Sequence, residues 1–247
     1  MTGSARDQIL ARIRAANRTA GPAAGGGLTA GGGPAAGQRA DRDADAAYAT
    51  LARRYLRAHH AAAAHDIAAL FAERAADYRA IVERVPEAGL AGAIARVLAA
   101  RSAAAPGPFV VPEELPAGWL AELPGEITLA RDEPPLPAAE LDRMSGVVTG
   151  CAVAIAETGT IILDHGPGQG RRALTLVPDF HLVVVREDQV AADLADAFAR
   201  LDPARPHTLI SGPSATSDIE LIRVEGVHGP RHLHVLLAGP GQGDAAM

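Results

Sequence analysis

The sequence contains no lysine: all 23 of its basic residues are arginine. Without lysine the chain cannot form a Schiff base with a carbonyl substrate or with pyridoxal phosphate. It also lacks the lysine with which Walker A loops and protein kinases contact nucleotide phosphates. These mechanisms are excluded for this chain, and positive charge in a binding site has to come from arginine or from a helix dipole.

Cysteine is almost absent as well, since Cys151 is the only one in 247 residues. A single cysteine cannot close an intramolecular disulfide, and it cannot supply the ligands of a cysteine-bound iron–sulfur cluster or of a four-cysteine zinc site. Because Cys151 begins an apolar run, we expect a small buried residue rather than a reactive thiol. We therefore expect this chain by itself to hold no cysteine-bound iron–sulfur cluster and no four-cysteine zinc site.

Aromatic residues make up only 3% of the chain, so the core has to be built from alanine, valine, leucine and isoleucine. Long apolar runs are missing too: no stretch of ~18 apolar residues could span a membrane. Residues 1–17 lack the apolar region of a secretory signal. The net charge of −6 argues against a nucleic-acid partner, because phosphate binding needs a basic surface. We expect a cytoplasmic protein without a membrane span.

Glycine is plentiful but clustered, and the clusters indicate how the chain is divided. Residues 20–40 are almost entirely glycine, alanine and proline, a composition typical of a flexible tether. Ahead of it, Ile9, Leu10 and Ile13 lie at helical spacing. The expected parts are an amphipathic helix at 1–19, a linker at 20–40, a folded domain at 41–240 with a helical lead-in at 41–75, and a flexible tail at 241–247.

Strand-like runs alternate with helical patterns over the rest of the chain, which indicates an α/β fold. The segment 151–163 predicts a hairpin in which Gly159 is free to adopt positive φ. We therefore expect a mixed, mostly parallel sheet with helices on both faces. The expected strands are 78–82, 109–112, 126–130, 147–150, 151–156, 160–164, 181–186, 207–211 and 232–238, and the expected helices are 41–74, 87–101, 138–143 and 187–201.

The first candidate site combines Thr149 and Gly150 with the turn residues 157–160. A glutamate at the end of a strand, such as Glu157, can act as a nucleophile or a base. The alternative is that Glu157 and Thr158 are ordinary turn residues facing water.

The second candidate is the segment 210–220, in which a strand runs into Gly-Pro-Ser and then into a predicted helix start. Serine hydroxyls and backbone N–H groups at a helix N-terminus can hold an anion. The alternative is ordinary N-capping by Ser217 or Asp218. The arginines that could add charge are Arg171, Arg172 and Arg231.

The third candidate is His228, which lies between Gly226 and Gly229. An imidazole titrates near neutrality, so it can serve as an acid or a base, or it can hold its loop by hydrogen bonds. His232 and His234 share one strand face, but no carboxylate pattern accompanies them, so we expect no metal site.

Four segments together resemble the LUD domain family, and within it the lactate-utilisation protein C branch: 149–163, the strand at 181–185, 210–220 and 226–238. The resemblance implies a fold like that of the NagB, RpiA and CoA-transferase proteins. It also implies a subunit, itself without a redox centre, that acts with iron–sulfur partner proteins in oxidising L-lactate to pyruvate. Cys151 and Ala215 depart from the family pattern, and the loss of a basic residue at 215 weakens the case for anion binding.

The family motif positions carried by this sequence are Thr149, Gly150, Glu157, Thr158, Gly159, Thr160, Ser211, Gly212, Pro213, Ser214, Thr216, Asp218, Glu220, Gly226, His228, Gly229 and Pro230. We take Glu157 and His228 as candidate catalytic residues. The candidate ligand-binding or anion-binding residues are Thr149, Gly150, Thr158, Gly159, Thr160, Ser211, Gly212, Ser214, Thr216, Asp218 and Gly229.

Two other functions stay open at this point. One is a transferase-like enzyme that binds an organic acid or a CoA thioester and uses Glu157 as nucleophile. The other is a sensor of small anions without catalysis. The sequence leaves the oligomeric state open.

Overall fold

The computed structural model describes residues 10–12, 14, 50, 66–216, 224–226 and 228–240. The four described residues between 10 and 14 are helical. The rest of the expected N-terminal helix, the linker, most of the lead-in and the tail lie outside the described residues. Among the helices of the described part, none is long and apolar enough to cross a membrane.

Six parallel strands form the main sheet in the order β1-β12-β7-β4-β2-β3. The central strands are apolar and buried almost throughout, as a parallel sheet covered on both faces requires. In register, Leu233 lies beside His181, which lies beside Val147. The strands are β1 (Ile81–Pro86), β2 (Phe109–Val111), β3 (Leu129–Arg131), β4 (Gly146–Thr149), β7 (Phe180–Arg186) and β12 (His232–Gly239).

A second sheet has four strands in the order β8-β5-β6-β9. The expected hairpin is present as the antiparallel pair β5–β6, but it belongs to this sheet, so the main sheet is wholly parallel. A short antiparallel pair, β10–β11, stands apart. These strands are β5 (Val153–Ile155), β6 (Thr160–Leu163), β8 (Val190–Ala191), β9 (Thr208–Ile210), β10 (Ala215–Thr216) and β11 (Val224–Glu225).

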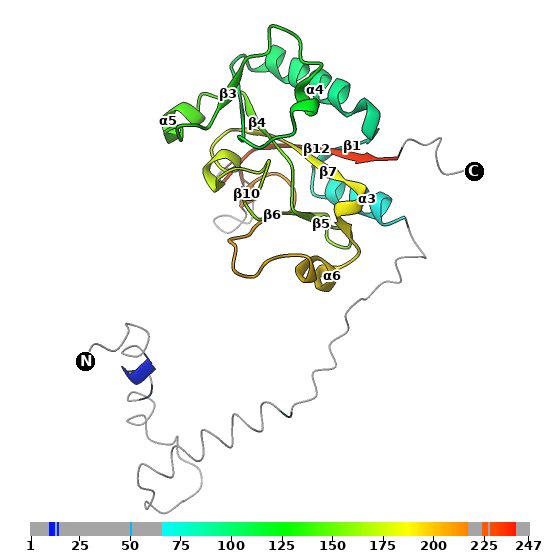
Figure 1. Cartoon of the computed structure of the whole chain (residues 1–247), viewed down its shortest axis with the longest axis vertical. Coiled ribbons are helices and arrows are strands. Elements are labelled where there is room, and N and C mark those ends of the chain that lie inside the picture. The colour runs from blue at the N-terminus through cyan, green and yellow to red at the C-terminus, as the bar shows by residue number, and fades with distance from the viewer. Residues whose placement is uncertain are drawn as a thin grey trace, which may run out of the picture. The chain divides into compact units, whose positions relative to one another are not determined.

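Helices cover both faces of the main sheet, which confirms the expected fold class. Ile94 packs with Val184 and Leu236 on the face under α4. Phe71 of α3 packs with Val183 on the opposite face, which the second sheet also covers (Figure 1). The helices are α3 (Ile67–Asp77), α4 (Leu90–Ala104), α5 (Ala138–Leu141) and α6 (Leu194–Ala199), with 3-10 turns η1 (Glu87–Gly89), η2 (Ala117–Leu120), η3 (Arg172–Thr175) and η4 (Glu187–Gln189).

Three expected elements differ from the structure, and the strand expected over 126–130 begins only at Leu129. The helix predicted over 187–201 is wrong in its first half, because β8 pairs with β5 and α6 begins only after the Asp193 cap. That pairing joins residues far apart in the sequence, so local periodicity does not show it. The sequence predicts the first strand over 78–82, whereas α3 runs to Asp77 and β1 begins at Ile81.

Candidate functional site

A cavity of about 320 Å³ opens where the two sheets meet. Its wall contains His181 and Leu233, at the beginnings of the neighbouring strands β7 and β12. Residues 208–215, from β9 to the start of β10, and 228–230 complete the opposite side. Open α/β sheets usually bind ligands at the carboxyl ends of their strands. This cavity lies instead at the amino ends of β7 and β12.

The two most specific sequence motifs meet at Ser214. Its backbone N–H donates to the carbonyl of Pro230 at 2.8 Å, and its carbonyl accepts from Gly226 N–H at 2.9 Å. Its hydroxyl oxygen accepts from His228 N–H at 3.2 Å. The Ser-Gly-Pro-Ser loop (211–214) and the Gly-Pro loop (228–230) therefore form one hydrogen-bonded wall, and Ser211, Gly212, Ser214, His228 and Gly229 all line the cavity.

A chain of hydroxyl groups joins the 157–160 turn to this wall. Thr158 Oγ1 lies 2.7 Å from Thr160 Oγ1, which lies 2.8 Å from Ser211 Oγ. Gly159 in this turn has φ +60°, as expected, and Gly212 in the loop has φ +81°. Two of the predicted turn residues therefore reach the cavity rim through hydrogen bonds rather than by lining it.

His181 is a site residue that sequence reasoning missed. It is fully buried, and its Nε2 lies 2.7 Å from Thr149 Oγ1, whereas its Nδ1 has no hydrogen-bond partner within the described residues. Burial lowers the pKa of His181 to about 4, so the ring is neutral near pH 7. An unpaired buried polar atom costs about 1–3 kcal/mol. The available signal was a histidine at the start of an otherwise apolar buried strand.

Of the three arginines predicted to supply charge, Arg172 lines the cavity. It is exposed, and it makes no ion pair with any residue that the structure describes. Arg171 instead holds Asp132 through two hydrogen bonds of 2.6 and 2.9 Å. Arg231 holds Asp179 in the same bidentate manner.

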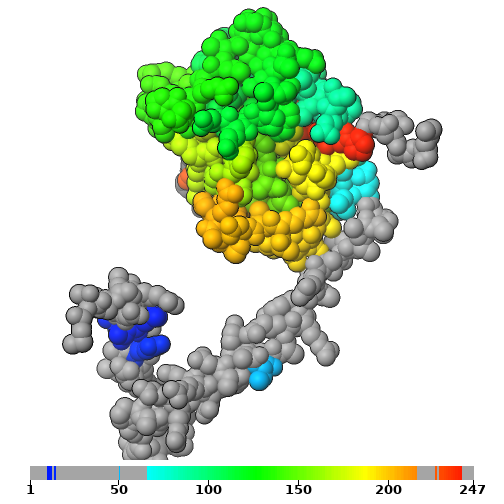
Figure 2. All heavy atoms as spheres, in the orientation of Figure 1, coloured from blue at the N-terminus to red at the C-terminus, as the bar shows by residue number. Residues whose placement is uncertain are grey.

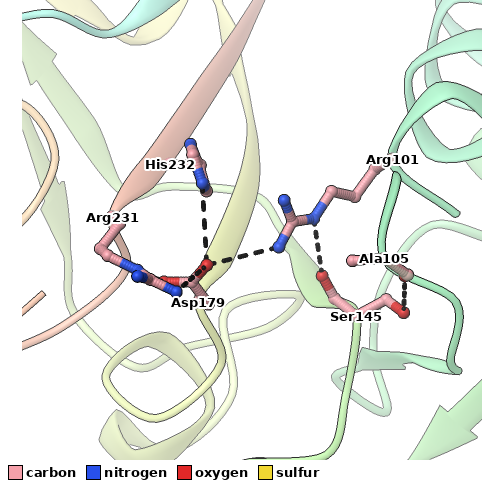
Figure 3. Close-up of polar contacts among 6 residues, drawn as sticks. All are labelled: Arg101, Ala105, Ser145, Asp179, Arg231 and His232. Carbon is pink, nitrogen blue, oxygen red and sulfur yellow. Dashed lines mark hydrogen bonds and ion pairs between the residues drawn. The ribbon is translucent and has the colours of Figure 1, made fainter. Parts of the chain in front are cut away.

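Asp179 lies between Arg231 and Arg101 (Figure 3). Arg231 Nε and Nη2 lie 2.6 and 3.1 Å from its carboxylate, and Arg101 Nη2 lies 3.4 Å away. Burial pushes the pKa of Asp179 up, but the hydrogen bond and charge of Arg231, together with His232, outweigh it and hold that pKa below its ordinary range. The guanidinium of Arg231 is therefore bound to Asp179, and Arg231 is not among the residues that line the cavity.

Glu157 lies apart from the cavity. It lines a separate hollow with Leu194, Ala195 and Phe198 of α6, a segment on the surface seen in Figure 2. The two candidate catalytic residues, Glu157 and His228, thus line different hollows. Thr149 reaches the cavity only through His181, and Gly150 N–H donates to the carbonyl of Gly168.

Directly after the Ser-Gly-Pro-Ser loop, Ala215 and Thr216 form β10, which pairs with β11. The helix start predicted at Ser217 or Asp218 lies outside the described residues. Asp218 and Glu220 lie outside the described residues.

Cys151 is buried, as predicted, and burial raises the pKa of its thiol to about 12.

The two histidines of β12 each lie near a carboxylate: His234 lies 2.9 Å from Glu83, and His232 lies 3.7 Å from Asp179. Across the ranges that the structure covers, no three histidine, cysteine, aspartate or glutamate residues gather as metal ligands. The cavity is therefore the place where several predicted residues and one missed residue come together.

Comparison with known proteins gives consistent matches. The family model described as the LUD domain matches residues 137–238. The Deinococcus radiodurans protein named lactate utilization protein C is 53% identical over 174 residues, which cover 68% of this chain and 78% of that protein. A protein of the same name from Geobacillus kaustophilus is 31% identical over 162 residues, covering 58% and 66%.

Two further matches widen the comparison. The uncharacterized protein YkgG of Escherichia coli is 38% identical over 84 residues, which cover 31% of this chain and 36% of that protein. A crystal structure of a DUF162 family protein from Deinococcus radiodurans superposes with a TM-score of 0.57 at 44% identity. That match covers 70% of this chain and 97% of the solved chain.

Proposed function

Because the chain belongs to the LUD domain family, in the branch of proteins named lactate utilization protein C, we propose that it is a cytoplasmic subunit of an L-lactate utilisation system. In this system L-lactate is oxidised to pyruvate, and two electrons and two protons leave the substrate. Iron–sulfur partner proteins accept the electrons. This chain has no redox centre of its own and contributes the cavity.

The observation that carries the proposal is the 53% identity to the Deinococcus radiodurans protein over 174 residues. The structure adds two supporting features. The only cysteine is buried, and its pKa of about 12 makes it a poor metal ligand. The cavity is small and polar at its rim, as a site for a small carboxylate requires.

A tagged pull-down from the native host grown on L-lactate tests the partnership. We expect cysteine-rich iron–sulfur proteins to be recovered in a fixed ratio to the tagged chain, as read by mass spectrometry. The same tag on an unrelated protein is the control. Recovery of the chain alone under these conditions contradicts the partnership.

Deletion of the gene tests the physiological role separately. In a host without a paralogue, we expect loss of growth on L-lactate and normal growth on an unrelated carbon source, with rescue by the restored gene. Unchanged growth on L-lactate contradicts the role.

The transferase alternative has less support, because Glu157 and the Ser-Gly-Pro-Ser loop line different hollows. It predicts a covalent adduct at Glu157 after incubation with acyl-CoA. An unchanged intact mass across a broad acyl-CoA panel excludes it.

A further inference from the structure

The cavity runs along the free edge of a strand. Thr208, Leu209 and Ile210 of β9 all line it. Because successive side chains of a strand point to opposite faces of the sheet, a hollow that three consecutive residues line lies along the edge of that strand. β9 is the last strand of the second sheet, and among the described strands it pairs only with β6. Its other edge therefore offers backbone N–H and C=O groups to a further strand.

Exposed apolar side chains border this edge. Leu209 is 49% exposed, although its register partner Ile162 is fully buried. Tyr78 is 47% exposed, and it lies against the Ser-Gly-Pro-Ser loop, since a Cβ at Gly212 would come within 2.5 Å of its carbonyl oxygen. Ile81, three residues further along the chain, is 59% exposed. A group of large apolar side chains left half exposed is typical of a surface that a partner covers.

The charges at the cavity favour an acidic partner. The chain has 29 acidic residues, yet none of the described residues that line the cavity is an aspartate or a glutamate. Arg172 lines the cavity, is exposed, and forms no ion pair within the described part of the chain. Ser211 and His228 also line it and are exposed. An acidic side chain at this rim therefore meets a guanidinium and a hydroxyl group without meeting a like charge.

We propose that an extended, acidic segment of an iron–sulfur partner protein pairs with the free edge of β9 and places a carboxylate at Arg172 and the Ser211 hydroxyl. This inference rests on the proposed function, which it deepens by naming the surface on which the partner docks. In strand addition, main-chain hydrogen bonds supply the affinity, and side chains at alternate positions supply the specificity. Leu209 and Tyr78 provide the apolar contacts beside the added strand.

An engineered thiol at the edge tests the surface in the intact complex. Leu209→Cys places the only accessible thiol there, because Cys151 is buried and its pKa is about 12. The tagged variant is recovered from the native host grown on L-lactate, and a photo-crosslinker attached to this thiol is activated. We expect mass spectrometry to find position 209 joined to an acidic segment of an iron–sulfur partner. Phe198→Cys, at a similarly exposed apolar position on α6, is the matched control and should not reach that segment.

The outcomes of this experiment separate the surface from the partnership. A partner that is recovered but is not cross-linked through position 209 overturns the surface and leaves the partnership standing. Recovery of no partner contradicts the proposed function, and the docking surface falls with it. A cross-link to a segment without acidic residues overturns the acidic occupant.

Hydrogen exchange distinguishes strand addition from a looser contact. Amide exchange over 208–210 should be about fivefold or more slower in the complex than in the isolated full chain, because the added strand protects amides of the edge. Exchange over 194–199 should be the same in both. Unchanged exchange over 208–210 overturns the pairing. L-lactate added to the isolated chain should have no effect at 208–210, and protection by L-lactate alone assigns the rim to a free carboxylate and overturns the docked segment.

Charge reversal tests the acidic character of the partner segment. Arg172→Glu is expected to lower the amount of partner recovered about tenfold or more, because like charges then face each other. Arg131→Glu reverses an exposed arginine of β3 that does not line the cavity, and it should leave recovery unchanged. Urea unfolding of both variants establishes that they fold. Equal recovery of the partner by the two folded variants overturns the role of Arg172.

Discussion

Asp179 shows how one side chain joins three elements at the amino edge of the main sheet. Its carboxylate binds Arg231 before β12 and Arg101 of α4, while Asp179 itself precedes β7. Arg101 also donates to the carbonyl of Ser145, and its guanidinium lies 5.3 Å from the centroid of the Phe180 ring. Removing the carboxylate leaves two arginines without their shared partner, and this residue therefore carries a pH-dependent part of the stability.

We predict that Asp179→Asn lowers the free energy of unfolding by about 1–2 kcal/mol at pH 7. This range already allows for solvent screening, because the ion pair is partly exposed. The folded-state pKa of Asp179 lies below its ordinary value of about 4, so the stabilisation is fully present above that pH. It is lost as the pH falls through the lower folded-state pKa. Urea unfolding between pH 7 and pH 3 measures the difference.

Asp188→Asn is the control, because the exposed pair of Asp188 with Arg186 lies within one 3-10 turn and should contribute about 0.5 kcal/mol or less. The Asp179→Asn variant and the unmodified chain should differ less in free energy of unfolding at pH 3 than at pH 7. A difference that stays constant over this range contradicts the pH dependence assigned to Asp179.

The sequence allows a site residue to be predicted when that residue belongs to a recognisable motif. It does not allow this when the residue reaches the site only because distant parts of the chain fold together. Ser211, Ser214 and His228 belong to recognisable motifs and do line one cavity. His181 has no motif role, and its importance depends on an unpaired nitrogen that only a folded arrangement defines. The motifs group Glu157 with the loop residues, yet the fold directs it to the α6 hollow.

At the scale of elements, the 157–160 turn depends on a close approach to α3. A Cβ at Gly159 would overlap the backbone of Arg74 and Ala75 near the end of that helix, and its φ of +60° disfavours side chains in any case. The turn therefore packs against the helix only because residue 159 is glycine.

We predict that Gly159→Ala lowers the free energy of unfolding by about 2 kcal/mol or more, because strain and overlap add. Gly118→Ala is the matched control: no atom lies within 4 Å of a Cβ there, so its effect should be close to zero. Denaturant unfolding measures both variants. Similar small effects of the two substitutions contradict the close packing of the turn.

The elements that the sequence predicted well are those set by local pattern. The apolar runs at 181–186 and 232–238 became β7 and β12, and the helical spacing over 87–101 became η1 and α4. Val190 and Ala191 escaped prediction, because their strand exists only through pairing with β5. The location of the cavity also escaped, since it depends on how two sheets pack together.

At the scale of the whole described body, the two sheets share one core. Ile161 and Ala154 of the second sheet pack in the same cluster as Val183 and Val235 of the main sheet. Trp119, the only tryptophan, packs in the cluster under α4 on the opposite face of the main sheet. Unfolding of the small sheet should therefore be inseparable from unfolding of the whole.

We predict that Ile161→Ala lowers the free energy of unfolding by about 2–5 kcal/mol, because it leaves a cavity at a fully buried position. The shift in the urea midpoint should be the same by Trp119 fluorescence and by far-ultraviolet circular dichroism. A midpoint that moves by one probe and not by the other contradicts the shared core.

The hydroxyl chain from Thr158 through Thr160 to Ser211 has a property that its distances alone do not convey. Each hydroxyl carries a single hydrogen, so Thr160 can donate to only one of its two neighbours, and a Ser211 hydroxyl that donates outside the row must accept from Thr160. An anion that accepts the hydrogen of Ser211 selects one direction for the row. The turn beside α6 and the rim of the cavity thereby share a single polarity, which is set by whatever occupies the rim.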